Sequence, residues 1–145
     1  MFTIRRMEER DLEQVVEMEK NIFSDPWSRT SFLDSLNQDM CMYLVVSKQE
    51  EIVAYSGVYV IQDEGQITNV AVKADYRNEH IATDMLNELI KRAEDKGAQD
   101  FTLEVRESNG AAIHLYEKLG FKSVGTRKNF YENPLEDAMI MWRYK

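Results

Sequence analysis

The sequence predicts an α/β domain in which a mixed central sheet of about six to seven strands is flanked by four helices. First, the 145 residues contain no repeat, low-complexity tract or Pro/Gly-rich linker, so residues 1–145 are expected to form a single domain. Second, the apolar segments follow the order β-α-α-β-β-β-α-β-α-β-β, antiparallel early and α/β-like later. Third, each helix has only one apolar stripe to bury, which favours helices on both faces of the sheet.

The first half of the chain predicts one strand, two helices and then three consecutive strands. Apolar residues recur at helical spacing over Leu12–Phe23, and Asp25-Pro26-Trp27 breaks this first helix before a second begins near Ser28. A polar turn at residues 48–51 joins two of the strands into an expected hairpin. The strands of this half are expected at Phe2–Arg5, Met42–Ser47, Ile52–Ile61 and Gln66–Val72.

The second half contains the clearest helix of the chain. Its apolar stripe runs from Ile81 to Ala93, and Gly97 supplies the stop. A shorter helix is expected at Asn109–Leu119, ended by Gly120. The remaining strands are expected at Phe101–Val105, Lys122–Thr126 and Ala138–Arg143.

Charge and composition exclude several classes of protein. The formal net charge of −8 argues against a general binder of nucleic-acid phosphates, which would carry a basic face. It is compatible with a cationic substrate, and equally with negative charge that only keeps the protein soluble. No apolar run approaches the roughly 20 residues of a membrane span, and residues 1–6 lack the apolar core of a signal peptide. Together with the single Cys41, these features predict a cytoplasmic protein with no membrane partner.

Metal coordination and cysteine catalysis are not expected. The two histidines are not accompanied by a Cys cluster or a carboxylate triad at ligand spacing, so the sequence predicts no metal site. Cys41 opens a strand and is expected to be a small core residue rather than a nucleophile.

The segment from Glu104 to Phe121 carries the groups best suited to chemistry. It joins the end of an apolar strand to a short amphipathic helix. Glu104 and Tyr116 stand 12 positions apart (116 − 104), on either side of a turn led by Asn109. A base, a capping amide and an acid at a strand-to-helix junction are what group transfer to an amine requires. The segment is therefore a candidate active site.

Other blocks place this segment in a family context. The strand Thr68–Val72 is followed by Tyr76–Ala82, which leads into the long helix. This arrangement resembles the GCN5-related N-acetyltransferases (GNAT) and, within them, the bacterial ribosomal-protein alanine N-acetyltransferases. The subgroup resemblance rests on Pro26-Trp27-Ser28, on Leu103-Glu104-Val105-Arg106 with Ser108-Asn109, and on Phe130-Tyr131 followed by Glu136-Asp137-Ala138. It implies a GNAT fold and acetyl-CoA as co-substrate.

In the resembling family, coenzyme A docks at a strand, turn and helix N-terminus. The first amides of a helix lack intrahelical partners and carry partial positive charge, so a pyrophosphate can bind them. The family's loop reads Arg or Gln, two variable residues, Gly, one variable residue, then Gly or Ala. Arg77, Ile81 and Ala82 fit, but His80 stands in place of the first glycine. Its imidazole would crowd the pyrophosphate, point away from it, or donate a hydrogen bond to it. The coenzyme-binding residues implied are Val70, Ala71, Val72, Arg77, Asn78, Glu79, His80, Ile81, Ala82, Thr83 and Asn109.

The resemblance implies that Glu104 is the general base, acting on the acceptor amine through a water. The alternative is a surface carboxylate at a strand end that pairs with Arg106. A backbone N–H near Val72, where the family's strand separates from its neighbour, would stabilise the oxyanion.

The resemblance also implies that Tyr116 protonates the departing sulfur of the coenzyme. The alternative is an aromatic residue that only packs beside Ile113 and Leu119. Asn109 is expected to cap its helix and, by resemblance, to hydrogen-bond the pantetheine arm as well.

Two aromatic residues are implied near the acceptor. Trp27 would line the substrate groove, or else pack in the core beside the break at Pro26. Tyr131 would lie near the acceptor amine, or else be an exposed loop aromatic.

The predicted function is acetyl transfer from acetyl-CoA to an N-terminal amine, that of the N-terminal alanine of a small-subunit ribosomal protein. One alternative keeps the chemistry and changes the acceptor to a lysine, a polyamine or another small amine. A second alternative, from another class, is a non-catalytic coenzyme- or protein-binding module whose phosphate loop has decayed at His80.

Overall fold

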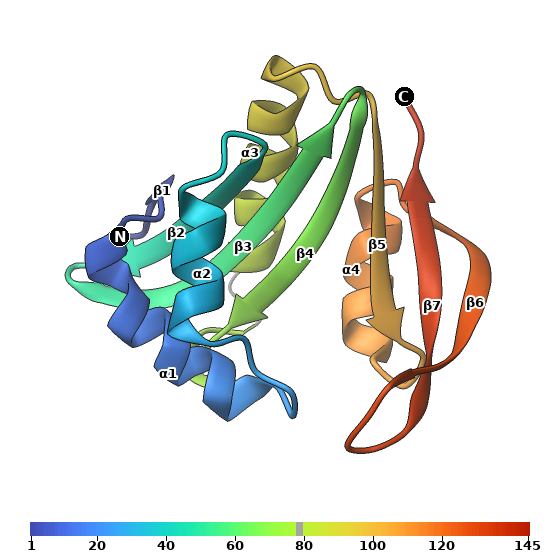
Figure 1. The fold of residues 1–145 in the computed structure, drawn as a ribbon, viewed down its shortest axis with the longest axis horizontal. Helices are drawn as coiled ribbons and strands as arrows, with labels where there is room; N and C mark the ends of the chain where they lie inside the picture. The colour runs from blue at the N-terminus through green and yellow to red at the C-terminus, as the bar shows by residue number, and fades with distance from the viewer. Residues whose placement is uncertain (78–79) are drawn as a thin grey trace.

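A computed structural model describes residues 1–77 and 80–145 and shows one seven-stranded sheet with helices on both faces (Figure 1). The strand order is β1-β2-β3-β4-β5-β7-β6. β4 and β5 pair in parallel, and the other neighbouring strands pair antiparallel. The strands are β1 (Thr3–Arg6), β2 (Cys41–Lys48), β3 (Glu51–Ile61), β4 (Glu64–Val72), β5 (Asp100–Arg106), β6 (Lys122–Tyr131) and β7 (Glu136–Arg143). The predicted fold class and element order are confirmed.

Two pairs of helices cover opposite faces of this sheet. Along β2, Tyr43 and Val45 pack in the cluster that includes α1 and α2, whereas Met42 and Leu44 pack in the cluster that includes α3 and α4. A strand covered on both faces reads as a continuous apolar run, which is why this one was recognisable from the sequence. The helices are α1 (Leu12–Ile22), α2 (Arg29–Leu36), α3 (Ile81–Asp95) and α4 (Gly110–Lys118), with 3₁₀ turns η1 (Glu9–Asp11) and η2 (Ala74–Tyr76).

The C-terminal hairpin is longer than the sequence predicts. β6 continues to Tyr131 and β7 begins at Glu136, where those two residues pair. The register shifts between Arg127 and Tyr131, so residues 128–130 bulge from the edge of the sheet. Apolar periodicity does not record such a bulge, because β6 is an exposed edge strand.

A bulge in β4 is stabilised by a tyrosine from two strands away. Tyr43, Gly57 and Asn69 lie side by side on β2, β3 and β4, and the register shifts just after Gly57, leaving Thr68 as the extra residue. A Cβ at residue 57 would clash with the ring of Tyr43, so glycine lets the ring lie across β3. The Tyr43 hydroxyl then reaches Thr68 Oγ1 at 3.4 Å and Asn69 Oδ1 at 3.3 Å.

β4 and β5 separate immediately before this bulge. Their pairing covers Glu64–Gln66 and Asp100–Thr102 and stops there. Beyond Gln66 the two strands diverge, as Figure 1 shows. A bulge bends the strand that contains it, which accounts for the divergence at this point.

The longest helix, α3, has 15 residues. Within the described residues, no helix combines the length and apolar character that crossing a bilayer requires.

Candidate active site

The end of β4 directs backbone groups toward the edge from which β5 has separated. Lys73 N donates to Val53 O on β3 at 2.9 Å. Because successive residues of an antiparallel strand alternate between its two edges, the N–H and C=O of Val72 point the other way. The contact of Arg77 agrees with this direction, since its Nε donates to Val72 O at 3.2 Å. The N–H of Val72 therefore has the orientation expected of an oxyanion donor.

His80 adopts the backbone conformation that glycine favours. Its φ of 62° and ψ of 13° lie in the left-handed region, and its side chain is exposed. Its carbonyl accepts from Asp84 N at 3.1 Å and starts α3. This placement fits the alternative in which the imidazole points away and leaves the first amides of α3 free. Asn78 and Glu79, also implied in coenzyme binding, lie outside the described residues.

The other residues implied in coenzyme binding lie at the start of α3 and the end of β4. Ile81 is buried in the core, while Ala82 and Thr83 are half-buried in the first turn of α3. Val70 is half-buried like Val72, and Ala71 is buried on the side of α1 and α2.

Glu104 lies on the face of β5 opposite Leu103 and Val105, which are buried against α3 and α4. Its side chain is 18% exposed, and its Oε2 lies 3.1 Å from Nε of Arg127 on β6. That oxygen is buried and makes no hydrogen bond to a described residue, so the contact is an ion pair alone. The alternative pairing of Glu104 with Arg106 is wrong, because Arg106 pairs with Glu136 instead.

Glu104 lines an open pocket of about 360 Å³ on this face of the sheet. The carboxylate therefore borders space that an acceptor or a water can enter. The pocket is lined by Glu64, Gln66, Thr102, Glu104, Arg127, Ile140 and Trp142.

Tyr116 approaches β5 from the opposite face. It is 6% exposed and packs in the core under α3 and α4, with its ring edge-on to Phe121 at 6.1 Å. Ile113 and Leu119 pack against the same cluster, as in the packing alternative. Burial raises the pKa of Tyr116, and the nearby Tyr131 raises it further. The phenol is therefore protonated at neutral pH, as a proton donor must be.

Asn109 caps α4, as the sequence predicts. Its Oδ1 accepts from Ala112 N at 3.2 Å, which satisfies one of the free amides of the first turn. The side chain of Asn109 lies at the surface, close in the chain to the end of β5.

Tyr131 interacts electrostatically with groups on both faces of β5. It is half-buried, so it is not the exposed loop aromatic of the alternative. Burial raises its pKa, the Glu104 carboxylate raises it further, and the Arg106 guanidinium lowers it. Because Tyr131 also acts on the pKa of Tyr116, it lies within electrostatic reach of both candidate catalytic residues.

Trp27 packs against the core of α1 and α2. Its ring lies 5.4 Å from that of Phe32 and 6.4 Å from that of Tyr43. Its backbone N–H donates to Glu19 Oε2 at 3.0 Å, and Tyr55 donates its hydroxyl to Oε1 of the same carboxyl. The ring is half-buried, as the core alternative predicts.

Sequence reasoning missed two residues that organise this region, Glu19 and Arg106. Glu19 is 2% exposed, and the signal that marks it is a carboxyl inside the apolar stripe of the first helix. Arg106 binds segments far away in the chain, which no local pattern reveals.

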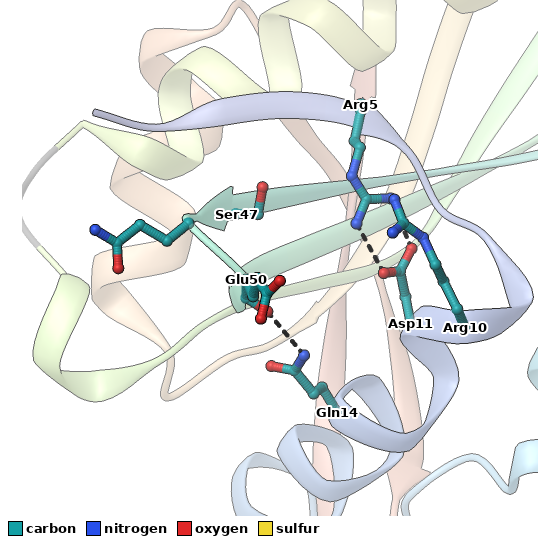
Figure 2. Close-up of a pocket in the computed structure, with 7 residues that line it drawn as sticks. Arg5, Arg10, Asp11, Gln14, Ser47 and Glu50 are labelled. Atoms are coloured by element: carbon teal, nitrogen blue, oxygen red, sulfur yellow. Dashed lines mark hydrogen bonds and ion pairs between the residues drawn. The ribbon is translucent and has the colours of Figure 1, made fainter.

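A second pocket lies at the β1 end of the sheet, far from the diverging strands (Figure 2). Arg5 donates to both oxygens of Asp11 at 2.7 and 2.8 Å, and Gln14 donates to Glu50 O at 3.1 Å. Figure 2 shows these groups directed at one another. These side chains bind one another and the backbone of the β2–β3 turn, so we assign them a structural role. Among the described residues, no group of three or more His, Cys, Asp or Glu side chains could bind a metal ion.

A model of the acetyltransferase (GNAT) family matches residues 12–121. A protein of Bacillus subtilis (strain 168), provisionally named a [ribosomal protein bS18]-alanine N-acetyltransferase, is 36% identical over 140 residues, covering 96% of this chain and 93% of its own length. The chain belongs to the GNAT acetyltransferase family.

Solved structures agree with this membership. The GNAT chain is similar to the ribosomal-protein-S18-alanine N-acetyltransferase from Escherichia coli, with a TM-score of 0.90 and 33% identity over 99% of this chain and 94% of that one. It also has the fold of Arabidopsis thaliana NAA60 in complex with acetyl-CoA, with a TM-score of 0.91 and 17% identity over 99% and 98% of the two chains. The predicted GNAT fold and the resemblance to the ribosomal-protein alanine N-acetyltransferases are confirmed.

Proposed function

We propose that this GNAT protein transfers the acetyl group of acetyl-CoA to the N-terminal alanine of ribosomal protein bS18. The observation that carries the chemistry is the separation of β4 from β5, with Glu104 on one face of β5 and Tyr116 on the other. The choice of acceptor rests on the names of the relatives from Bacillus subtilis and Escherichia coli. A ribosomal acceptor would place the reaction in the cytoplasm.

Acetyl-CoA would bind on the α3 and α4 side of the sheet. The amides of Ile81, Ala82 and Thr83 in the first turn of α3, which have no intrahelical partners, would bind the pyrophosphate, and Asn109 at the start of α4 would contact the pantetheine arm. The thioester would then lie where β4 leaves β5, with its carbonyl oxygen near the N–H of Val72.

The acceptor amine would approach from the face that carries Glu104. A peptide α-amine has a pKa of about 8, against about 10.4 for lysine, so a carboxylate acting through a water is a sufficient base near neutral pH. The neutral nitrogen attacks the thioester carbonyl carbon and forms the new C–N bond, and its surplus proton passes through the water to Glu104.

Collapse of the tetrahedral intermediate breaks the C–S bond. The Val72 N–H would stabilise the oxyanion before this step, and the departing thiolate would take the phenolic proton of Tyr116. The products are the acetylated N-terminus and coenzyme A. Glu104 then releases its proton to solvent, and Tyr116 regains one from solvent.

Mass spectrometry on a panel of acceptors tests this proposal. The panel contains a peptide with the bS18 N-terminal sequence, peptides beginning with Ser or Met, lysine peptides with blocked N-termini, and spermidine. We expect one acetyl group on the N-terminal nitrogen of the alanine-led peptide, and none on the same peptide already acetylated there. Acetylation of lysine or spermidine alone would refute the proposed acceptor and leave the proposed acetyl transfer from acetyl-CoA standing.

Calorimetry with acetyl-CoA tests the alternative of a non-catalytic module. We expect saturable binding at one site, because the His80 backbone keeps the left-handed conformation that glycine favours at this position. Binding without acetylation of any panel member would favour the binding module, and absence of both would contradict an acetyl-CoA enzyme.

A further inference from the structure

Arg106 contacts segments that lie far from it in the chain. It lies on β5 two residues after Glu104, on the same face of the sheet. Its Nη1 donates to Pro134 O at 2.9 Å and to Glu136 Oε1 at 3.1 Å. Its Nη2 donates to Glu132 O at 2.8 Å and to Ser24 Oγ at 3.2 Å.

Apart from Glu136, which begins β7, these partners come from two connections between elements. One is the α1–α2 connection, residues 23–28, and the other is the β6–β7 connection, residues 132–135. They lie side by side (Figure 1), and Asn133 Nδ2 also donates to Asp25 Oδ1 at 3.1 Å. Arg106 therefore joins two segments that are about 110 residues apart in the chain to the strand that carries Glu104.

The same guanidinium fixes Tyr131. Its central carbon lies 4.5 Å from the centre of the Tyr131 ring, within the range of a cation–π contact. Glu136 in turn accepts from Ser108 N at 2.6 Å, which ties the start of the α4 turn to the same cluster. A planar group with several donors suits this arrangement, whereas a lysine ammonium could not reproduce it.

We propose that Arg106 is a positioning residue for acceptor binding, which keeps Tyr131 and the α1–α2 and β6–β7 connections in place beside Glu104. The inference rests on the proposed transferase function. The Arg106 side chain points away from Leu103 and Val105, and the side-chain contacts given above are not to the coenzyme side. Asn109 on that side donates its N–H to the backbone oxygen of Arg106 at 3.0 Å, a bond that a side-chain substitution keeps. Loss of the Arg106 side chain should therefore weaken binding of the acceptor peptide and leave the affinity for acetyl-CoA unchanged.

Steady-state kinetics on Arg106→Lys and Arg106→Gln tests this role. We expect KM for the acceptor peptide to rise at least tenfold in both variants, while calorimetric acetyl-CoA affinity stays within twofold of wild type. Ser24→Ala, which removes the hydrogen bonds of the Ser24 hydroxyl with Arg106 and with Glu132 O, should raise acceptor KM about two- to threefold. Arg92→Lys is the matched control, because Arg92 pairs with Glu88 within α3 and should leave both constants unchanged.

The proposal would be overturned by an acceptor KM within twofold of wild type. It would also be overturned if binding of the acceptor peptide and of acetyl-CoA weakened by the same factor. Hydrogen exchange gives a readout that needs no substrate: Arg106→Lys should speed amide exchange in residues 23–28 and 129–136 and leave α3 unchanged. Uniform or unchanged exchange would also overturn it. The wild type is first tested on the acceptor panel, so that a failure of the proposed function is seen separately from a failure of the Arg106 role.

Discussion

Replacing Glu19 by leucine, and in parallel by glutamine, measures how much the buried carboxyl stabilises the acceptor side of the fold. Glu19 Oε2 accepts from the backbone N–H of Trp27 at 3.0 Å, and Oε1 accepts from the hydroxyl of Tyr55. Both the carboxyl and Tyr55 are fully buried, so water cannot replace a lost partner. A leucine side chain at this position would leave at least these two donors unsatisfied at once, and it would also remove the hydrogen-bond interaction of the carboxyl with Asn69.

An unsatisfied buried donor costs about 1–3 kcal/mol, so two donors cost about 2–6 kcal/mol before the gain from no longer burying a carboxyl. We expect Glu19→Leu to lower the free energy of unfolding by about 3 kcal/mol, or roughly 10 °C in Tm at about 2–4 °C per kcal/mol. Glu19→Gln should cost only about 1 kcal/mol. Its amide can turn so that the oxygen accepts from Trp27 and the nitrogen donates to the Tyr55 oxygen.

The carboxyl also predicts a pH dependence. Burial raises the pKa of Glu19, against hydrogen bonds from Trp27, Tyr55 and Asn69 that lower it. In the pH window between the unfolded and folded pKa values, the folded state binds the extra proton, so stability falls as pH rises. The contribution of Glu19 is complete below its unfolded pKa and is lost as pH passes through its folded pKa. Glu19→Gln removes this dependence.

Urea denaturation followed by far-UV circular dichroism at a series of pH values gives both quantities. The stability difference between wild type and Glu19→Gln should be largest in acid and shrink toward neutral pH. The reasoning is refuted if Glu19→Leu costs less than about 1 kcal/mol, or if the difference grows as pH rises.

Other substitutions test the remaining site residues. Tyr116→Phe should lower kcat at least about tenfold with little change in acetyl-CoA affinity, and Glu104→Gln should do the same; steady-state kinetics with wild-type turnover in both would contradict these roles. His80→Gly should raise the free energy of unfolding by up to about 1 kcal/mol by removing a left-handed non-glycine residue, and calorimetry should show acetyl-CoA affinity unchanged or improved. A large loss of affinity would instead show that His80 contacts the coenzyme. Asn109→Ala should cost about 1 kcal/mol in thermal denaturation, with Asn109→Ser retaining most of the stability, because either oxygen can cap α4.

The parts of the site that were predictable are those set by local pattern. The alternation of β5 puts Leu103 and Val105 in the core and Glu104 on the other face, and a helix led by an Asn is capped by it. The partner of Glu104 was not predictable. Arg127 reaches it across β7, a strand placed between β5 and β6 by long-range pairing, and the residue of β7 that pairs with Arg127 is the small Ala138.

The conformation of His80 was predictable only in part. Motif comparison marks the position as one where the family uses glycine, and φ of 62° shows that the backbone demand persists with a different side chain. Histidine is among the residues that tolerate the left-handed region, so the substitution changes the side chain and keeps the loop. The sequence alone shows that His80 departs from the motif, whereas the structure shows that the backbone conformation of the loop is kept.

The Val72 N–H and the acceptor side of the site are both positioned by the same group of buried side chains. The Tyr43 hydroxyl contacts Thr68 and Asn69 at the bulge where β4 turns away from β5. Asn69 also lowers the pKa of Glu19, whose carboxyl accepts from the backbone N–H of Trp27 in the α1–α2 connection. Because one chain of buried contacts runs from the β4 bulge to that connection, a core substitution there shifts both the Val72 amide and the acceptor approach. Core packing under α1 and α2 is therefore part of the geometry of the reaction, although none of these side chains needs to touch a substrate.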